Sequence, residues 1–131
     1  RYLSPFFYGE KTEKFYMLCL DAKSTVIKLV KLSSGIPQEV RVDVRDVVDN
    51  ALKYKAVSVV VAHNHPSGDV SPSVQDVELT RAIAAALQLI KIKLADHHIF
   101  SDFGYCSFVE DGVGGQIQQN VNNFLKDGIK Y

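Results

Sequence analysis

The stretch 57-VSVVVAHNHPSGDVSPSVQD-76 decides the fold, because it runs from a buried strand through a tight turn into a helix. Its first part, 57-VSVVVA-62, is short, β-branched and apolar on both faces, which is typical of a central strand covered on two sides. The residues 66-PSG-68 have the chemistry of a turn. Serine followed by proline in 71-SP-72 is typical of a helix start, with the serine as N-cap. The stretch therefore predicts a strand, a turn and a helix in direct succession.

Two strands and one helix are expected before this stretch. The apolar run 15-FYMLCL-20 and the alternating run 25-TVIKLVKLS-33 are separated by the turn residues 21–24, which favours an antiparallel hairpin. Apolar residues then recur at helical spacing over residues 44–52, where Asp43 can cap the start of a helix.

A helix, two strands and a further helix are expected after it. An apolar stripe at helical spacing runs from residue 77 to about residue 89. The segment 90-IKIKLADHHIF-100 alternates in its first half, and Gly104 marks the turn into 105-YCSFV-109. Further glycines precede 116-QIQQNVNNFL-125, which predicts a C-terminal helix. The order β-β-α-β-α-β-β-α predicts an α/β layered fold with a mixed sheet.

The composition is that of one soluble globular domain. The chain has 131 residues, of which 47% are hydrophobic and 23% are charged. Its 15 basic and 15 acidic residues cancel, and no cluster of lysine and arginine stands out. The charge pattern therefore gives no electrostatic reason to expect nucleic-acid or membrane binding.

Two further features concern the compartment and the extent of the chain. Cys19 and Cys106 lie far apart, each within an apolar run, which predicts reduced and buried thiols. No apolar run reaches the roughly 20 residues of a membrane span, and the N-terminus lacks a secretion signal, so a cytoplasmic protein is expected. Because the chain begins at Arg1, we expect a fragment or a processed form.

His63 and His65 are candidates to hold a metal ion together with an aspartate. Residues i and i+2 of an extended strand point to the same side, with Cα atoms roughly 6.5 Å apart, so both imidazoles can reach one ion. Asp76 lies about one turn into the expected helix, which fixes its direction. Asp69 is closer in sequence and competes as the third ligand, but it follows Gly68 in a loop.

Such a ligand set suits a catalytic zinc site. Two nitrogens and one carboxylate oxygen are suitable ligands for Zn²⁺, and three protein ligands leave a fourth position for a water molecule. Zinc lowers the pKa of this water to ~7, so that it becomes a usable nucleophile. Histidines on a turn are more often solvated than metal-bound, however, and the spacing alone leaves both interpretations open.

The same residues resemble a known family signature. The segments 63-HNHP-66 and 73-SVQD-76, six residues apart, fit the pattern H-x-H-P-x(6)-S-x-x-D. This pattern resembles the metal signature of the JAMM (MPN) metalloprotease superfamily. The motifs AHNHPSGD, ELTR and DHHIF resemble, more narrowly, its bacterial RadC-like branch, whose members are named as DNA repair proteins. The resemblance extends from about Glu13 to Gly112.

The resemblance implies a role for each matching residue. His63, His65 and Asp76 would coordinate Zn²⁺. Ser73 would form a hydrogen bond near the metal and stabilise an oxyanion. In RadC-like sequences the catalytic glutamate stands at the head of the first core strand, which reads roughly E-x-F-x-x-L-x-L-D.

The segment 13-EKFYMLCLD-21 matches that strand, so the resemblance implies Glu13 as the general base. Glu10 is a rival, because it lies three residues away in a segment of uncertain form. The pair His97 and His98 follows an aspartate, as is usual in the family. Neighbours on a strand alternate, so at most one of these histidines can face the interior. We expect it to have a structural role, or to orient a metal ligand by a hydrogen bond.

The fold implied by the resemblance is a three-layer α/β/α arrangement with a mixed sheet, similar to that of cytidine deaminases. Residues 1–12 would form a leading segment, 13–112 the RadC-like JAMM (MPN) domain, and 113–131 a helical C-terminal extension. The implied activity is that of a zinc-dependent metallohydrolase. It would cleave peptide or isopeptide bonds of a protein or peptide substrate, using a metal-activated water and a glutamate base.

Two other functions are weighed against this one. A non-catalytic binding or scaffold module accessory to DNA repair would resemble MPN domains that lack the metal ligands, whereas here the ligand set is complete. RadC-like proteins usually carry an N-terminal helix-hairpin-helix region, and we expect any DNA binding to depend on such a region. A nucleobase deaminase needs H-x-E followed by P-C-x-x-C, and neither element occurs in the sequence.

Overall fold

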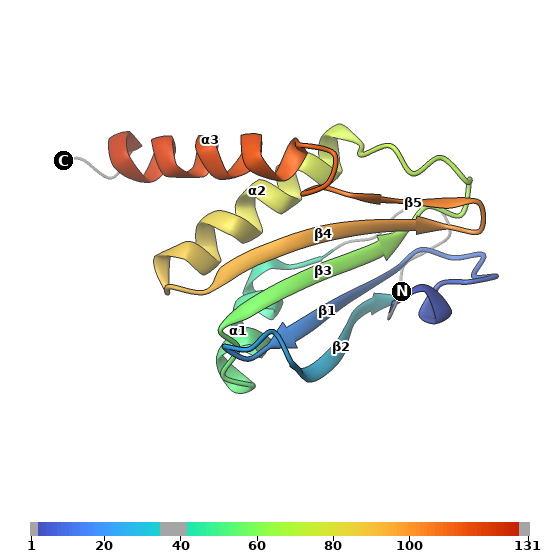
Figure 1. Cartoon of the computed structure of the whole chain (residues 1–131), viewed down its shortest axis with the longest axis horizontal. Helices are drawn as coiled ribbons and strands as arrows, with labels where there is room; N and C mark the ends of the chain where they lie inside the picture. The colour runs from blue at the N-terminus through green and yellow to red at the C-terminus, as the bar shows by residue number, and fades with distance from the viewer. Residues whose placement is uncertain (1–2, 35–41, 129–131) are drawn as a thin grey trace.

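A computed structural model of the chain describes residues 3–34 and 42–128, which form one sheet and three α-helices (Figure 1). The order of elements is the predicted β-β-α-β-α-β-β-α, preceded by one short 3₁₀ turn. In chain order the elements are η1 (Ser4–Phe6), β1 (Lys14–Leu20), β2 (Val26–Ser34), α1 (Val44–Lys53), β3 (Ser58–Asn64), α2 (Val74–Leu89), β4 (Lys93–Ser101), β5 (Gly104–Ser107) and α3 (Val113–Gly128).

The five strands form a single mixed sheet in the order β2-β1-β3-β4-β5. β3 and β4 are parallel, and every other neighbouring pair is antiparallel. A parallel pair needs a long crossover, which α2 provides between β3 and β4. Consequently the C-terminal ends of β3 and β4 lie side by side, and the turn that follows β3 begins there. The predicted α/β class with a mixed sheet is therefore confirmed.

All three helices pack on the same face of the sheet. Val47 and Ala51 of α1 share one core cluster with Ile83 and Leu87 of α2 and with the inward-facing residues of β1 and β3. Ile117 belongs to a second cluster, which α3 forms with α2, β4 and β5. Figure 1 shows α2 and α3 lying beside each other along the sheet.

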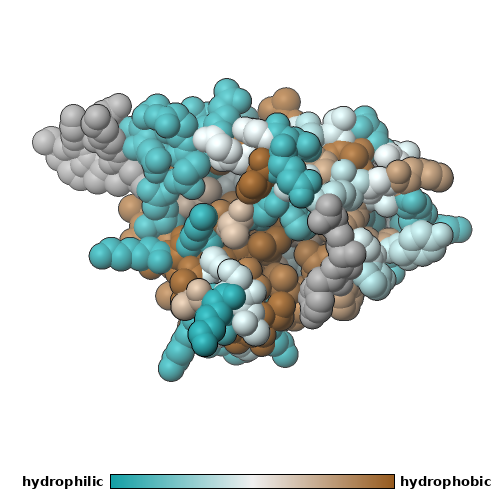
Figure 2. All heavy atoms as spheres, viewed as in Figure 1, coloured by the Kyte–Doolittle hydropathy of each residue, from teal (hydrophilic) through white to brown (hydrophobic). Residues whose placement is uncertain are grey.

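The other face of the sheet is covered by the N-terminal segment. Leu3 and Phe7 pack against Ala62 and Phe100, and the ring of Phe7 stacks on that of Phe100 with centroids 5.1 Å apart. Hydrophobic side chains gather over the strands in Figure 2, while hydrophilic ones lie along α3. Within residues 3–34 and 42–128 the second cover is this aromatic segment with the short 3₁₀ helix η1, and the α-helices lie on the opposite face. β3 is apolar on both faces because of this cover.

Several element boundaries differ from the sequence-based ones. The N-cap of α2 is Ser73 and not Ser71, because Oγ of Ser73 accepts from the Asp76 N–H (3.0 Å), whereas the N–H of Ser71 binds the Asp69 carboxylate in the preceding loop (2.9 Å). β4 begins at Lys93, after the chain has left α2 through residues 90–92. α3 begins at Val113, so that glycines expected in a turn lie within its first turn. The predicted Asp43 N-cap of α1 is confirmed.

Three further predictions can be compared with the structure. Cys19 and Cys106 are free and buried, as expected. No helix within residues 3–34 and 42–128 is long and apolar enough to cross a bilayer. The division at residues 12 and 112 stays a prediction, although Ile117 and Val121 of α3 pack in the same cluster as Ile99 of β4.

Candidate metal centre

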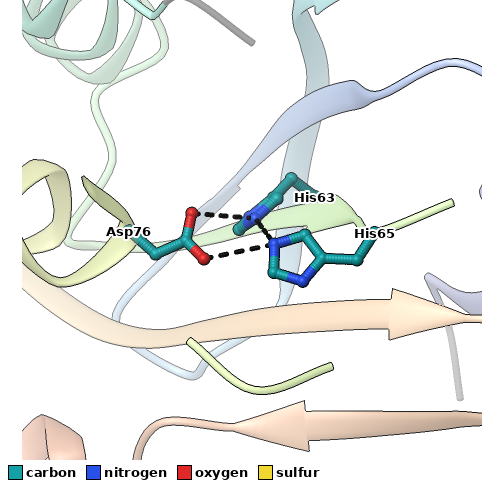
Figure 3. A group of neighbouring side chains, drawn as sticks. All are labelled: His63, His65 and Asp76. Atoms are coloured by element: carbon teal, nitrogen blue, oxygen red, sulfur yellow. Dashed lines mark hydrogen bonds and ion pairs between the residues drawn. The ribbon is translucent and has the colours of Figure 1, made fainter. Parts of the chain in front are cut away.

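The site lies where β3 ends and α2 begins. His63 is the next-to-last residue of β3, His65 follows the strand directly, and Asp76 is the third residue of α2. The tight turn between them has Gly68 at φ +98°, a conformation that glycine adopts readily, and the Gly68 N–H donates to the His65 carbonyl (3.0 Å). Figure 3 shows the three side chains pointing toward one another.

The three predicted ligands meet at one point. The Nε2 atoms of His63 and His65 are 3.0 Å apart. Each lies 3.2 Å from one carboxylate oxygen of Asp76, His63 from Oδ1 and His65 from Oδ2. The His63 side chain is almost fully buried, while those of His65 and Asp76 are 15% and 14% exposed. The cluster is therefore shielded but reachable from solvent.

Asp69 supports the site without contributing its carboxylate. Its backbone carbonyl accepts a hydrogen bond from Nδ1 of His65 (2.7 Å), and its carboxylate binds the Ser71 N–H. A carbonyl oxygen can only accept, so Nδ1 of His65 carries the hydrogen. In a neutral imidazole the lone pair is then on Nε2, which faces Asp76. The sequence-based choice of Asp76 over Asp69 agrees with this geometry.

This donor set fits a divalent metal ion. Nε2 lone pairs and a carboxylate repel one another at these distances unless a proton or a cation lies between them. The hydrogen bond with Asp76 raises the pKa of His65, although burial opposes the shift. Burial alone would raise the pKa of Asp76, but imidazoles that carry a proton on Nε2 hold it far below its ordinary value, so the carboxylate favours a positive charge at this point. Two imidazole nitrogens and one carboxylate oxygen form a set typical of open zinc sites.

Ser73 fixes the carboxylate through a capping box. Its Oγ accepts from the Asp76 N–H (3.0 Å), and the Ser73 N–H donates to Oδ2 of Asp76 (2.8 Å). The serine therefore orients a candidate ligand by way of the helix cap. Its implied role toward an oxyanion stays a prediction.

Two observations connect Glu13, rather than Glu10, with the cluster. The antiparallel register pairs Phe15 with His63, so continuing it by two residues places Glu13 opposite His65. The negative charge of Glu13 contributes to the raised pKa of His65, after the hydrogen bond with Asp76 and the other effects. Glu10, in contrast, is in a salt bridge with Lys14 (2.7 Å).

Asn64, which lies between the two histidines, has a supporting role that was not predicted from the sequence. Its side chain is buried, and Oδ1 accepts from the Lys14 N–H (2.6 Å) while Nδ2 donates to the Thr12 carbonyl (3.0 Å). These two bonds hold the backbone on either side of Glu13. A signal was present, because an asparagine at the end of an apolar strand must find partners when buried.

His97 is the histidine of its pair that faces the interior. Its side chain is buried, and Nε2 lies 2.8 Å from Nδ1 of His63, whereas His98 is half-buried and binds Asp96. Burial, with the nearby His63, holds the pKa of His97 well below its ordinary value. The prediction that only one of the two histidines faces inward is confirmed. The sequence did not indicate which one.

Comparison with known proteins places the chain in a family. A family model described as the RadC-like JAB domain matches residues 1–113. The chain belongs to the RadC-like JAB family. The resemblance to the RadC-like branch of the JAMM (MPN) superfamily is thereby confirmed.

Three curated relatives of this RadC-like chain are named UPF0758 protein. One from Acinetobacter baumannii is 43% identical over 78% of this chain and 43% of its own length. One from Porphyromonas gingivalis is 38% identical over 86% of this chain and 50% of its own length. One from Photobacterium profundum is 40% identical over 85% of this chain and 50% of its own length. The chain spans about half the length of these relatives.

Proposed function

We propose that this RadC-like domain is a zinc-dependent metallohydrolase that cleaves peptide or isopeptide bonds of a protein or peptide substrate. The observation that carries the proposal is the convergence of two Nε2 atoms and one carboxylate within 4.8 Å of one another. The set His63, His65 and Asp76 stands at an accessible strand end, beside a glutamate. Membership of the JAB family supports the same class of chemistry.

His63, His65 and Asp76 would hold the metal. When bound there, zinc supplies a Lewis acid that polarises the scissile carbonyl and acidifies a water molecule. The two histidines are suited to this task, because each ring is held by its Nδ1 atom and presents Nε2 to the site. Phe15 stacks on the ring of His63, with centroids 5.6 Å apart and planes at 8°, and so limits its rotation.

Glu13 is the general base of the proposed mechanism. Its carboxylate takes the proton from the attacking water and later delivers it to the leaving amine. Its place opposite His65 supports this assignment, because the charge is close enough to the cluster to raise the pKa of that imidazole. The bonds from Asn64 on either side of Glu13 hold the backbone that carries it.

Ser73 is proposed to donate a hydrogen bond to the developing oxyanion. In the capping box its Oγ is the acceptor, so the hydrogen of its own hydroxyl is not used there. A donor fixed before the reaction stabilises the negative charge of a tetrahedral intermediate more than the ground state. Ser73 thus combines two tasks, orienting Asp76 and facing the substrate oxygen.

Metal content and cleavage test the proposal separately. The purified chain should contain about one zinc per chain, as measured by inductively coupled plasma mass spectrometry, because one tetrahedral site is expected. His65→Ala should lose the zinc, while His98→Ala, which removes a half-buried imidazole outside the cluster, should keep it.

Cleavage is then followed by mass spectrometry on a mixed peptide and isopeptide library. Glu13→Gln should keep the zinc and lose at least ~100-fold in rate, as expected for loss of a general base. Glu10→Gln is the matched control and should leave the rate unchanged. Wild-type zinc content without any cleavage would favour the binding-module alternative, and full activity of Glu13→Gln would show that the base is another residue.

A further inference from the structure

We propose that Thr80 and His97 set the tautomer of His63 before a metal ion arrives, and are thus positioning residues of the site. The inference rests on the proposed metal site but concerns two side chains that are not among the candidate ligands. The three side chains form a continuous hydrogen-bonded chain behind the candidate ligands. The donor at each link follows from the identity of the atoms involved.

The first link fixes the hydrogen of the Thr80 hydroxyl. Oγ1 of Thr80 lies 2.6 Å from the backbone carbonyl oxygen of Asp76, one helical turn earlier. A carbonyl oxygen cannot donate, so the hydroxyl must donate its only hydrogen to it. This bond back to the i−4 carbonyl is a common arrangement for threonine within a helix.

The second link fixes the tautomer of His97. Oγ1 of Thr80 is also 2.5 Å from Nδ1 of His97. Because the hydrogen of the hydroxyl is already directed to Asp76, Oγ1 can only accept at this contact. The hydrogen between the two atoms therefore belongs to Nδ1 of His97.

The third link shows how the tautomer of His97 determines that of His63. The ring of His97 is 1% exposed and stacks on Phe108, with centroids 4.5 Å apart, while Phe15 meets it edge-on. An imidazolium in such an apolar slot is strongly disfavoured, so the ring is neutral and Nε2 carries a lone pair. Nε2 of His97 is 2.8 Å from Nδ1 of His63, which must then be the donor.

The result is a ring of His63 whose Nε2 lone pair faces Asp76 and His65. No hydrogen has to leave this nitrogen when a metal ion binds. The same helix provides both the Asp76 carboxylate and the hydroxyl of Thr80, which lies directly over the Asp76 carbonyl. A shift of α2 would thus disturb one ligand directly and the tautomer of another through His97.

Paired variants at position 80 test the relay. Thr80→Val removes the hydroxyl at nearly constant shape, whereas Thr80→Ser keeps it. Nitrogen-15 spectra of the imidazoles in the metal-free full chain report which nitrogen of His63 carries the hydrogen. We expect Nδ1–H in the wild type and in Thr80→Ser, and a mixture of tautomers in Thr80→Val. Zinc affinity, measured by competition with a chelator, should fall by about 10–100-fold in Thr80→Val and recover in Thr80→Ser.

A second pair acts at the middle of the relay. The amide oxygen of His97→Gln can accept from Nδ1 of His63, whereas His97→Leu offers no acceptor, so the glutamine variant should bind zinc more tightly than the leucine variant. An unchanged tautomer and an unchanged zinc affinity in Thr80→Val would overturn the inference. A wild-type chain that shows Nδ1–H at His63 but takes up no zinc would refute the proposed function and leave the tautomer assignment standing. A chain that binds zinc, but whose metal-free His63 carries its hydrogen on Nε2, would refute the tautomer assignment and leave the proposed metal site standing.

Discussion

Two half-buried carboxylates of this domain are alike in exposure and differ in what they face. The side chains of Asp76 and Asp96 are 14% and 15% exposed. Each lies within hydrogen-bonding or ion-pair distance of imidazole nitrogens, and each has a pKa below the ordinary value of aspartate. By burial and by pKa alone, both would be candidates for the same function.

Asp96 is saturated by donors of the protein. Its Oδ1 accepts from the backbone N–H groups of His97 (2.7 Å) and Val109 (3.0 Å). Its Oδ2 accepts from Nε2 of His98 (2.8 Å) and from Oγ of Ser107 (2.5 Å). Burial would raise its pKa, but these four bonds lower it to about 2. No lone pair of the carboxylate is left facing an open site, which is typical of a structural role.

Among residues 3–34 and 42–128, Asp76 receives one bond from a backbone group, the Ser73 N–H to Oδ2. The atoms nearest to its oxygens are otherwise Nε2 of His63 and Nε2 of His65, whose hydrogens are placed on Nδ1 by their other partners. A carboxylate that faces lone pairs needs a cation between them, and one that faces hydrogens does not. The difference between the two aspartates is therefore the placement of hydrogens and not the depth of burial.

The largest expected effect is on zinc affinity. Asp76→Asn replaces a charged ligand by a neutral amide and should weaken zinc binding by more than ~100-fold, since changes behind the ligands already cost about 10–100-fold. Asp96→Asn is the matched substitution and should bind zinc within a few-fold of the wild type. Chelator competition measures both. Equal losses in the two variants would mean that the contrast between the carboxylates is wrong.

The candidate ligands on one side of this contrast could be predicted from the sequence, and for a physical reason. His63, His65 and Asp76 are carried by a strand end, a turn and a helix start that are contiguous along the chain, so local geometry allows their convergence and the family signature favours it. The order of strands and helices could be predicted as well, because β1 and β3 are short apolar runs and α2 has apolar residues at helical spacing.

The residues that support the candidate ligands could not be predicted, because they depend on contacts between distant segments. Thr80 and His97, and Asn64 and Lys14, become neighbours only after the sheet and α2 have packed together. Alternation restricts the inward position to one of His97 and its neighbour, but the bulge between β3 and β4 decides which. The nature of the second cover could not be predicted either, since apolar residues on both faces of β3 do not specify whether an α-helix or an aromatic segment covers them.

The second prediction concerns the stability that Asp96 provides. Its pKa is about 2 in the folded chain and ~3.9 in an unfolded one, so the stabilisation is present above pH ~4 and is lost as the pH falls toward 2. The difference corresponds to on the order of 2 kcal/mol. Asp96→Asn should lower the free energy of unfolding by about this amount at pH 7, in metal-free protein.

Urea unfolding at several pH values measures this difference. Because other carboxylates titrate over the same range in both proteins, the comparison is made between wild type and Asp96→Asn at each pH. The gap between them should narrow from pH 4 to pH 2. A gap that stays constant over this range would show that the charge of Asp96 does not provide the stabilisation.

The smallest expected effect comes from the support behind the Asp76 carboxylate. Ser73→Ala removes the N-cap acceptor for the Asp76 N–H, which should cost about 1 kcal/mol in the free energy of unfolding. Ser71→Ala is the control, because Ser71 is exposed and its N–H, which binds Asp69, is kept. Zinc affinity should also fall in Ser73→Ala, though by less than in Asp76→Asn, since the carboxylate keeps its bond from the backbone N–H of residue 73 and only the Oγ that holds the Asp76 N–H is lost. If Ser73→Ala lost stability with no change in zinc affinity, the capping box would stabilise α2 without positioning the ligand.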